Sequence, residues 1–248
     1  MRYFVELAYN GKAYHGWQNQ PDAISVQETL EKALFTLLQA ETPVVGAGRT
    51  DAGVHATQYF AHFDAIDLFD LKNFVYKLNS VLPSDIAVYD LFKVTDEAHA
   101  RFNAISRSYQ YHIILRKDPF KYDAAHFVKN HLDMKKMNRA AAKLMDYVDF
   151  KCFSKSKTDV KTYNCMISHA EWKKEGDKLV FYITADRFLR NMVRAIVGTL
   201  LEIGLDKIPE DKLDEIIESR DRQNAGTSVP AKGLYLTEIE YPTSILIK

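Results

Sequence analysis

Residues 46–56 bring together the residue types that enzymes most often use for chemistry. The segment reads Gly-Ala-Gly-Arg-Thr-Asp-Ala-Gly-Val-His-Ala, and its glycines allow sharp turns and a close approach of the backbone to a ligand. One residue separates Arg49 from Asp51, so both side chains can point into one cleft if the backbone is extended there. A carboxylate beside an arginine stays ionised, which suits a nucleophile or an electrostatic stabiliser rather than a general acid. Taken alone, the same residues also suit an ordinary turn with a surface ion pair, and that simpler interpretation is favoured.

The glycine spacing of this segment matches neither common phosphate-binding motif. It has no closing Gly-Lys-Ser/Thr, and the glycine after Gly46 and Gly48 is Gly53, which breaks the dinucleotide pattern G-x-G-x-x-G. The chain has no G-x-S-x-G nucleophile elbow. Its histidines and its two cysteines, Cys152 and Cys165, lack the close spacing of metal ligands or of a disulfide framework. We therefore expect no metal and no cofactor, and a reducing cytoplasm as the setting.

A second segment, residues 99–111, interleaves basic and aromatic side chains. Arg101 and Arg107 can pair with phosphates, and the neighbouring rings can stack on bases. The alternative is a plain amphipathic strand with Tyr109 and Tyr111 in the core, and without other observations this alternative is favoured.

A third segment, residues 187–198, carries three arginines before an apolar stripe. Arg190 and Arg194 are four residues apart, so we expect them on one face of a helix, with Arg187 adding to a basic N-terminal turn. An arginine on such a face can hold a carboxylate in a bidentate pair. A surface-exposed basic stripe explains the spacing equally well.

The elements that must position these segments mix strands and helices along the whole chain. Each half contains both, so we expect an α/β (α+β) protein with a first domain over residues 1–104, which holds the Asp51 loop, and a second over 105–248. Alternating apolar residues predict strands near 2–9, 57–63, 86–94, 106–115, 165–172, 178–185 and 234–241, and helical spacing predicts helices that begin after Ser25, Asp70 and Asp133 and over 188–203 and 210–219.

Charge and hydropathy limit the class of protein. The 248-residue chain has a formal net charge of zero, and no apolar run approaches the roughly 18 residues that a membrane span needs. The charge is segregated, which permits a basic face beside an acidic one, although ordinary solvated faces explain it as well. Basic runs lie at Arg101, Arg107, Arg116 and Lys117 without an acid, and at Lys151, Lys155, Lys157 and Lys161 with only Asp159.

Taken together, these segments resemble the tRNA pseudouridine synthase A family over essentially the whole chain. Residues 48–56 look like the signature of that family, and they are highly specific. Residues 161–164 lack an arginine expected shortly after Lys161-Thr162, and residues 117–130 give no motif. The other matching motifs follow in the expected order at residues 9–11, 14–18, 25–28, 82–86, 99–102, 107–109, 188–189, 192–194, 196–198, 230–231 and 233–236.

The resemblance implies a pseudouridine synthase fold, with two sheet-plus-helix domains flanking a central active-site cleft, and a homodimer that acts on tRNA. Its implied activity is that of an isomerase that converts uridine to pseudouridine at positions 38, 39 and 40 of the anticodon stem-loop. Asp51 matches the catalytic aspartate of the family, Tyr109 its active-site tyrosine and Arg194 the arginine that pairs with the aspartate. The substrate-binding residues that we expect are Tyr109, Arg49, His55, Arg101, Arg107, Arg190 and Leu234.

Two alternatives belong to other classes. A non-catalytic tRNA-binding or tRNA-folding protein on the same fold would keep the arginines and would not need Asp51. A carboxylate-based glycoside hydrolase would need a second carboxylate near the first, which the Asp51 loop does not offer.

Overall fold

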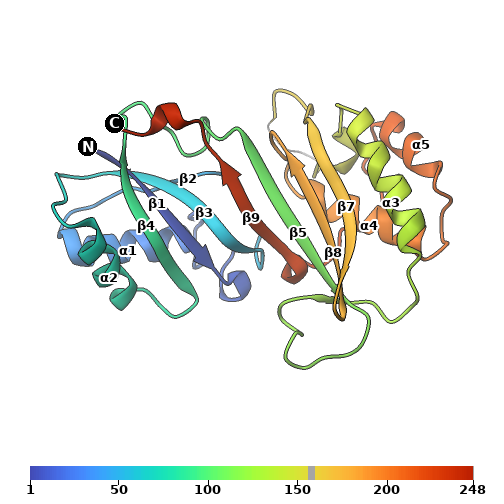
Figure 1. Ribbon diagram of the computed structural model, residues 1–248, viewed down its shortest axis with the longest axis horizontal. Coiled ribbons are helices and arrows are strands. Elements are labelled where there is room, and N and C mark those ends of the chain that lie inside the picture. The colour runs from blue at the N-terminus through green and yellow to red at the C-terminus, as the bar shows by residue number, and fades with distance from the viewer. Residues whose placement is uncertain (156–159, 248) are drawn as a thin grey trace. The chain divides into compact units, whose positions relative to one another are not determined.

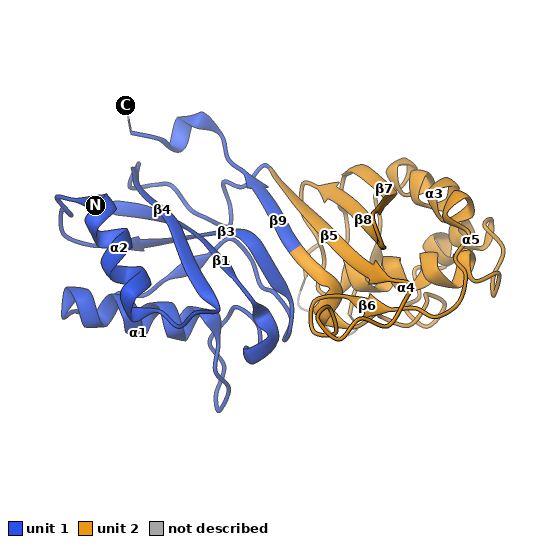
Figure 2. Cartoon of the chain, turned by 60° about the horizontal axis from the view of Figure 1, so that its bottom comes forward, with its two compact units in different colours: residues 1–105, 236–248 blue, residues 106–235 orange. Residues whose placement is uncertain are grey.

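The computed structural model describes residues 1–155 and 160–247, which form two compact units (Figures 1 and 2). Unit 1 holds Met1–Ile105 together with the C-terminal residues from Leu236, and unit 2 is Ser106–Tyr235. The sequence predicts one boundary near residue 105, whereas the chain passes from one unit to the other twice. The C-terminal residues contact the end of the first segment, where the Ile105 N–H donates to the Glu240 carbonyl at 2.8 Å.

The sheet of unit 1 has β1 (Arg2–Tyr9) between two antiparallel neighbours, β4 (Ile86–Val94) and β3 (His55–Asp64). On its other edge β3 pairs with β9 (Leu234–Glu240), and the short β2 (Val45–Gly46) also pairs with β3. The buried face expected in β1 is confirmed, since its odd-numbered side chains from Tyr3 to Tyr9 are all buried. The strand is not half-buried along its whole length, because Phe4 on the opposite face is buried as well.

A bulge in β3 determines which of its side chains share a face. Tyr9 pairs with Ala56, but Leu7 pairs with Tyr59, so β3 has one residue more than β1 over this stretch. The extra residue brings His55 and His62 to the same face of the sheet, opposite the face of Tyr59.

Two capped helices lie on one side of the unit 1 strands (Figure 1). In α1 (Val26–Leu38) the Ser25 hydroxyl accepts the Glu28 N–H at 3.0 Å, and in α2 (Leu71–Val81) the Asp70 carboxylate accepts the Asn73 N–H at 3.0 Å. Both caps confirm the predicted helix starts. The helices contact each other, and α2 packs on β4. Two single turns of 3-10 helix, η1 (Gly11–Ala13) and η5 (Thr243–Ile245), complete the unit.

Unit 2 is built on β8 (Lys178–Ala185), which pairs antiparallel with β5 (Ser106–Ile114) and β7 (Ile167–Glu175). Helix α3 (Met134–Lys143), capped by Asp133 as predicted, packs against β7 and against α4 (Met192–Gly204). The smaller elements are β6 (His126–Phe127), which runs parallel to β5, α5 (Lys212–Ser219), and the 3-10 turns η2 (Leu144–Asp146), η3 (Lys151–Phe153) and η4 (Ala231–Gly233).

The helix expected over residues 188–203 begins later, and this corrects one prediction. Helix α4 starts at Met192, because Asn191 adopts a left-handed conformation with φ of 67° that no α-helical turn can contain. Arg190 therefore precedes the helix, and its four-residue spacing from Arg194 does not place the two on one helix face. Within the described residues, every helix is too short or too polar to cross a membrane.

Candidate active site

Two tyrosine hydroxyls hold the loop that carries Asp51. The Tyr59 hydroxyl donates to the Gly48 carbonyl at 2.5 Å and accepts the Gly48 N–H at 3.2 Å. The Tyr9 hydroxyl lies 3.0 Å from the Thr50 hydroxyl. Because Tyr9 and Tyr59 are buried residues of the neighbouring strands β1 and β3, the sheet fixes the part of the loop that precedes Asp51.

The segment around η1 holds the same loop from the other side. The Gly53 N–H donates to the Tyr14 carbonyl at 3.2 Å, and Gly16, with φ of 91°, lies so close that an added Cβ would be 2.2 Å from the Thr50 carbonyl oxygen. Asp51 sits between these two anchors, where its carbonyl accepts the Val54 N–H at 3.1 Å in a tight turn. A carboxylate held on a loop with so many fixed points needs little reorganisation when it reacts.

The candidates of this loop differ in accessibility. Asp51 is half-buried and Arg49 is exposed. His55 is buried, and its Nδ1 accepts the Gly11 N–H at 3.1 Å, which gives it a visible part in holding η1 to β3. Arg101 is exposed on the turn that follows β4, with its guanidinium 5.5 Å from the Phe102 ring centroid.

In unit 2, β5 carries the candidates Arg107 and Tyr109. The Arg107 Nη1 donates to the Asp186 carbonyl at 3.0 Å. Tyr109 is half-buried, and its ring packs edge-to-face with the Phe188 ring, with centroids 5.2 Å apart. Tyr111, two residues on, is fully buried and belongs to the core. Of the two tyrosines, only Tyr109 thus offers part of its ring to a ligand.

Arg194 is held in a fixed direction by the backbone of residue 229. Its Nε–H donates to the Val229 carbonyl at 2.8 Å, and the Val229 N–H donates to the Arg194 carbonyl at 3.2 Å. Arg194 lies in the first turn of α4 and is half-buried. Arg190 is exposed, and its carbonyl accepts the Lys155 N–H at 3.0 Å. The two arginines that the sequence analysis paired therefore have different surroundings.

Residues 225–234 are held in position by close packing against α4 and β5. A Cβ added to Gly198 would lie 1.9 Å from the Thr227 carbonyl oxygen, so only glycine allows this approach. The Tyr111 hydroxyl donates to the Pro230 carbonyl at 2.8 Å, and burial raises the pKa of Tyr111, so this residue remains a neutral donor. Leu234, at the start of β9, is buried, which gives its side chain a place in the packing.

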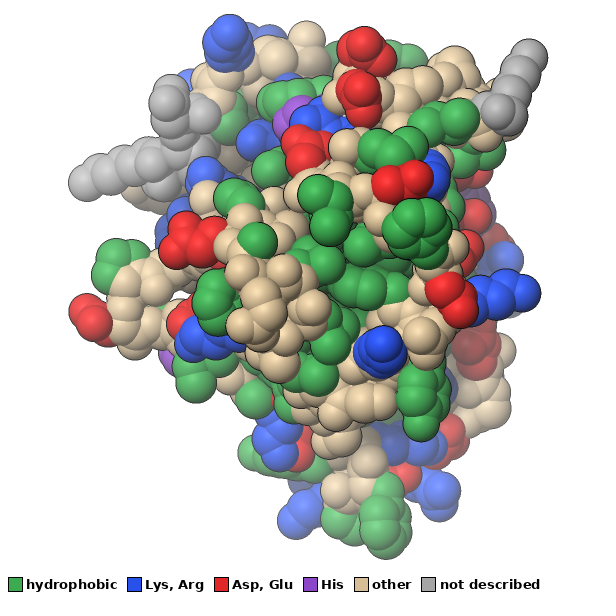
Figure 3. All heavy atoms as spheres, turned by 90° about the vertical axis from the view of Figure 1, so that its left-hand side faces the viewer, with side chains coloured by type: hydrophobic (Ala, Val, Ile, Leu, Met, Phe, Trp, Pro, Cys, Tyr) green, Lys and Arg blue, Asp and Glu red, His purple; other side chains and the backbone are tan. Residues whose placement is uncertain are grey.

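Arg116 of the predicted basic runs shares an acidic neighbour, Asp177, with Lys121, which lies outside those runs. Arg116 lies 3.8 Å and Lys121 lies 2.6 Å from the Asp177 carboxylate. Lys157 and Asp159 fall outside the described residues. The face of unit 1 in Figure 3 gathers hydrophobic side chains, with acidic and basic groups spread around them, so its described side chains do not concentrate positive charge for a polyanion.

Within residues 1–155 and 160–247, no group of three or more His, Cys, Asp or Glu side chains is arranged to hold a metal ion. Both cysteines are buried, and burial raises the pKa of Cys152 and of Cys165 to about 12.

Two residues that the structure singles out, Tyr59 and His62, were not predicted from the sequence. Tyr59 reaches Gly48 across the loop, and its signal in the sequence is only an aromatic residue in a strand. His62, described below, holds an exposed turn that carries Phe102. Phe102 lies in the predicted segment 99–111, but nothing in the sequence relates it to His62. Each of these roles depends on partners that come together only in the fold.

Known proteins resemble this chain over nearly its whole length. Residues 140–242 match the family model described as tRNA pseudouridine synthase. A protein of Parabacteroides distasonis named tRNA pseudouridine synthase A is 52% identical over 245 residues, which cover 98% of this chain and 97% of the relative. Proteins of the same name from Bacteroides thetaiotaomicron and Bacillus subtilis are 53% and 39% identical, over 98% and 97% of this chain and 92% and 99% of their own lengths.

Proposed function

Since the chain belongs to the tRNA pseudouridine synthase A family, we propose that it isomerises uridine to pseudouridine in tRNA, at positions 38, 39 and 40 of the anticodon stem-loop. The observation that carries this proposal is the full-length similarity to enzymes of that name, together with a multiply anchored loop that presents Asp51. We further propose that the protein acts as a homodimer in the cytoplasm.

The reaction needs no oxidant, reductant or energy source. The N1–C1′ bond of uridine breaks, the base turns, a C5–C1′ bond forms, the C5 proton leaves and N1 takes up a proton. Because the uridine is stacked in an RNA stem, it must first flip out, which costs a few kcal/mol. The work of the protein is therefore to expose the nucleotide, stabilise the separated sugar and base, and move one proton.

Asp51 is the residue to which we assign the bond-breaking step. Its carboxylate either attacks C1′ or removes a proton from C2′ on the way to a glycal, and both routes need an ionised group in a fixed position. The anchors on Gly48, Thr50 and Gly53 supply that fixed position.

The remaining candidates receive roles that their surroundings support. Tyr109 supplies a partly open ring for the uracil and a group that can take the C5 proton directly or through water. Arg194 supplies a guanidinium whose direction is set by Val229, suited to orient a carboxylate. The residues proposed to contact the rest of the substrate are Arg49, His55, Arg101, Arg107, Arg190 and Leu234.

The test is release of tritium from tRNA that contains [5-³H]uridine, with the wild type compared with Asp51→Asn. The variant keeps the shape of the side chain but removes its charge, so we expect release by the wild type and none above background by the variant. Asp22→Asn is the matched control: Asp22 is exposed in the same unit with φ of 58°, a conformation that Asn also adopts readily, and it should retain full activity.

Mapping the modified positions tests the finer part of the proposal. We expect new pseudouridine at positions 38, 39 and 40 and nowhere else in the tRNA. Tight tRNA binding by the wild type without tritium release would overturn the enzyme and favour a tRNA-binding protein.

A further inference from the structure

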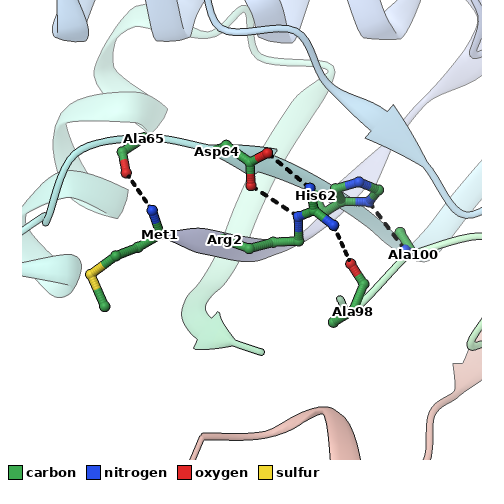
Figure 4. A network of polar contacts seen from close by, with 7 residues as sticks. All are labelled: Met1, Arg2, His62, Asp64, Ala65, Ala98 and Ala100. Atoms are coloured by element: carbon green, nitrogen blue, oxygen red, sulfur yellow. Dashed lines mark hydrogen bonds and ion pairs between the residues drawn. The ribbon is translucent and has the colours of Figure 1, made fainter. Parts of the chain in front are cut away.

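Residues 98–103, between β4 and β5, form a turn that unit 1 holds from three directions. The His62 Nδ1 accepts the Ala100 N–H at 3.1 Å, and the Arg2 Nη1 donates to the Ala98 carbonyl at 3.0 Å, as Figure 4 shows. The Tyr241 hydroxyl donates to the Ala100 carbonyl at 2.5 Å. These contacts come from β3, β1 and the C-terminal segment, so residues distant in the sequence help to fix the turn.

Hydrogen bonds within the turn add to its rigidity. The His99 N–H donates to the Asn103 side-chain oxygen at 2.6 Å, and the Asn103 N–H donates to the His99 carbonyl at 3.0 Å. The His99 Nδ1 accepts the Arg101 N–H at 3.1 Å. His99 also lies against His62, with ring centroids 4.8 Å apart.

His62 can perform this task only as a neutral ring. A backbone N–H can only donate, so the Nδ1 atom opposite Ala100 must carry a lone pair and no proton. The ring is 4% exposed and stacks beside Phe4, with the Arg2 guanidinium close by, and both burial and that charge disfavour an imidazolium.

The turn presents one large aromatic side chain to solvent. Phe102 is 73% exposed, although its ring is packed on one side against His99, with centroids 4.3 Å apart. The Arg101 guanidinium lies over the Phe102 ring, with its central carbon 5.5 Å from the ring centroid. An exposed aromatic ring in contact with a guanidinium is a combination that binds an unpaired base by stacking and its phosphate by charge.

The position of the turn separates it from the reacting nucleotide. His55 adjoins the Asp51 loop, and His62 lies seven residues further along β3, a distance of roughly 20 Å at the rise of a strand. The bulge of β3 puts both histidines on the same face of the sheet. A ligand at Phe102 is therefore a different nucleotide from the one that meets Asp51.

We propose that Phe102 stacks on an unpaired base of the tRNA remote from the uridine that reacts, and that His62 is the positioning residue that holds Phe102 in place. This inference rests on the proposed function, because it takes tRNA as the substrate. It adds a binding contact that contributes to substrate affinity and not to the chemical step.

The first test compares Phe102→Leu with Phe102→Tyr in tritium release from tRNA. Leucine keeps an apolar side chain but has no ring, so KM should rise on the order of 10-fold, the size expected for one stacked base, with kcat unchanged. Tyrosine keeps the ring and should stay within about twofold of the wild type. An unchanged KM for Phe102→Leu in an active enzyme overturns the inference and leaves the proposed function standing.

The second test asks whether His62 acts through Phe102. His62→Phe fills the space of the ring but removes the acceptor, whereas His62→Asn places an amide oxygen where Nδ1 lies. We expect His62→Phe to raise KM about as much as Phe102→Leu, and His62→Asn to restore most of the affinity. In the Phe102→Leu background, His62→Phe should add nothing further, whereas a general loosening of unit 1 would still add its full effect and would contradict the positioning role.

Direct binding of unmodified tRNA, with sedimentation of each variant, completes the design. A weaker Kd for Phe102→Leu supports the stacked base even if the wild type releases no tritium, which would remove the proposed function alone. An unchanged Kd, or a change of oligomeric state in place of a change in affinity, shows that Phe102 does not contact the tRNA.

Discussion

The hydroxyl of Tyr59 both gives and receives a hydrogen bond at Gly48, three residues before Asp51. The same ring is fully buried and stacks on Trp17 with centroids 4.1 Å apart, so the hydroxyl cannot move away from the loop. A single strand residue thus fixes both backbone polar groups of Gly48. The loop is therefore held in place by a residue that is packed in the core of unit 1.

Tyr59→Phe should loosen this loop without a change in core volume. Because the N–H and the carbonyl of Gly48 both lose a partner, we expect the free energy of unfolding to fall by about 1–2 kcal/mol, and kcat to fall while KM changes little. Urea unfolding and steady-state tritium release measure the two effects. Tyr89→Phe, at an exposed position of β4, is the control and should change neither quantity. Equal behaviour of the two variants would show that the Gly48 contacts do not support catalysis.

Gly198→Ala tests the approach of α4 to residues 225–229. In a helix interior, Ala is normally about 1 kcal/mol more favourable than Gly, so helix propensity alone predicts a gain in stability. We expect a loss of about 1–3 kcal/mol instead, because the new Cβ would overlap the Thr227 carbonyl. Thermal and urea unfolding give the sign. At Gly48 no atom of the described residues lies within 4 Å of an added Cβ, so Gly48→Ala should leave the free energy of unfolding nearly unchanged.

The free energy of unfolding should fall as the pH is lowered through the range where His62 titrates. Burial, Arg2 and His99 lower the pKa of His62 from 6.5 to about 4 in the folded protein, and Asp64 opposes them weakly. Between those pH values the unfolded chain binds more protons, so the contribution of neutral His62 is complete above about pH 6.5 and disappears by about pH 4. The loss amounts to about 3 kcal/mol.

A comparison with His62→Asn isolates this effect from the titration of other groups. The free energy of unfolding of both proteins is measured by urea unfolding from pH 7 to pH 4. As the pH falls, the wild type should lose more stability than the variant. Parallel curves over that range would mean that His62 is not held neutral by the fold.

The two thiols should resist alkylation and disulfide exchange in the folded protein. Only the thiolate reacts, and burial raises the pKa of Cys152 and Cys165 to about 12, so the reactive form is scarce at pH 8. We expect no rapid reaction with a chromogenic disulfide reagent until denaturant is added, when both thiols react. Fast modification of one thiol under native conditions would place that cysteine on an accessible surface.

The predictions that came true from the sequence are those that depend on neighbours in the chain. Ser25, Asp70 and Asp133 cap helices because a cap needs only the next three residues. The buried odd-numbered face of β1 likewise follows from the order of its own residues. The predicted start of α4 was wrong because Asn191 adopts a left-handed conformation that the apolar spacing after it does not reveal. That error also removed the expected pairing of Arg190 with Arg194.

The parts of the site that escaped prediction depend on distant partners. His62 meets Ala100 across 38 positions, and Arg194 meets Val229 across 35, so no local pattern reports either contact. The resemblance to a family identified Asp51, Tyr109 and Arg194 as candidates. Only the fold reveals what holds each of them.

The return of β9 to unit 1 has a consequence for synthesis on the ribosome. The strand that covers the outer edge of β3 emerges only after all of Ser106–Tyr235 has been made, which takes on the order of ten seconds at ordinary elongation rates. During that delay the nascent first segment exposes an unpaired strand edge, the kind of surface that recruits chaperones or other chains. A message truncated before the codon of Leu236 would yield a chain whose first unit never closes.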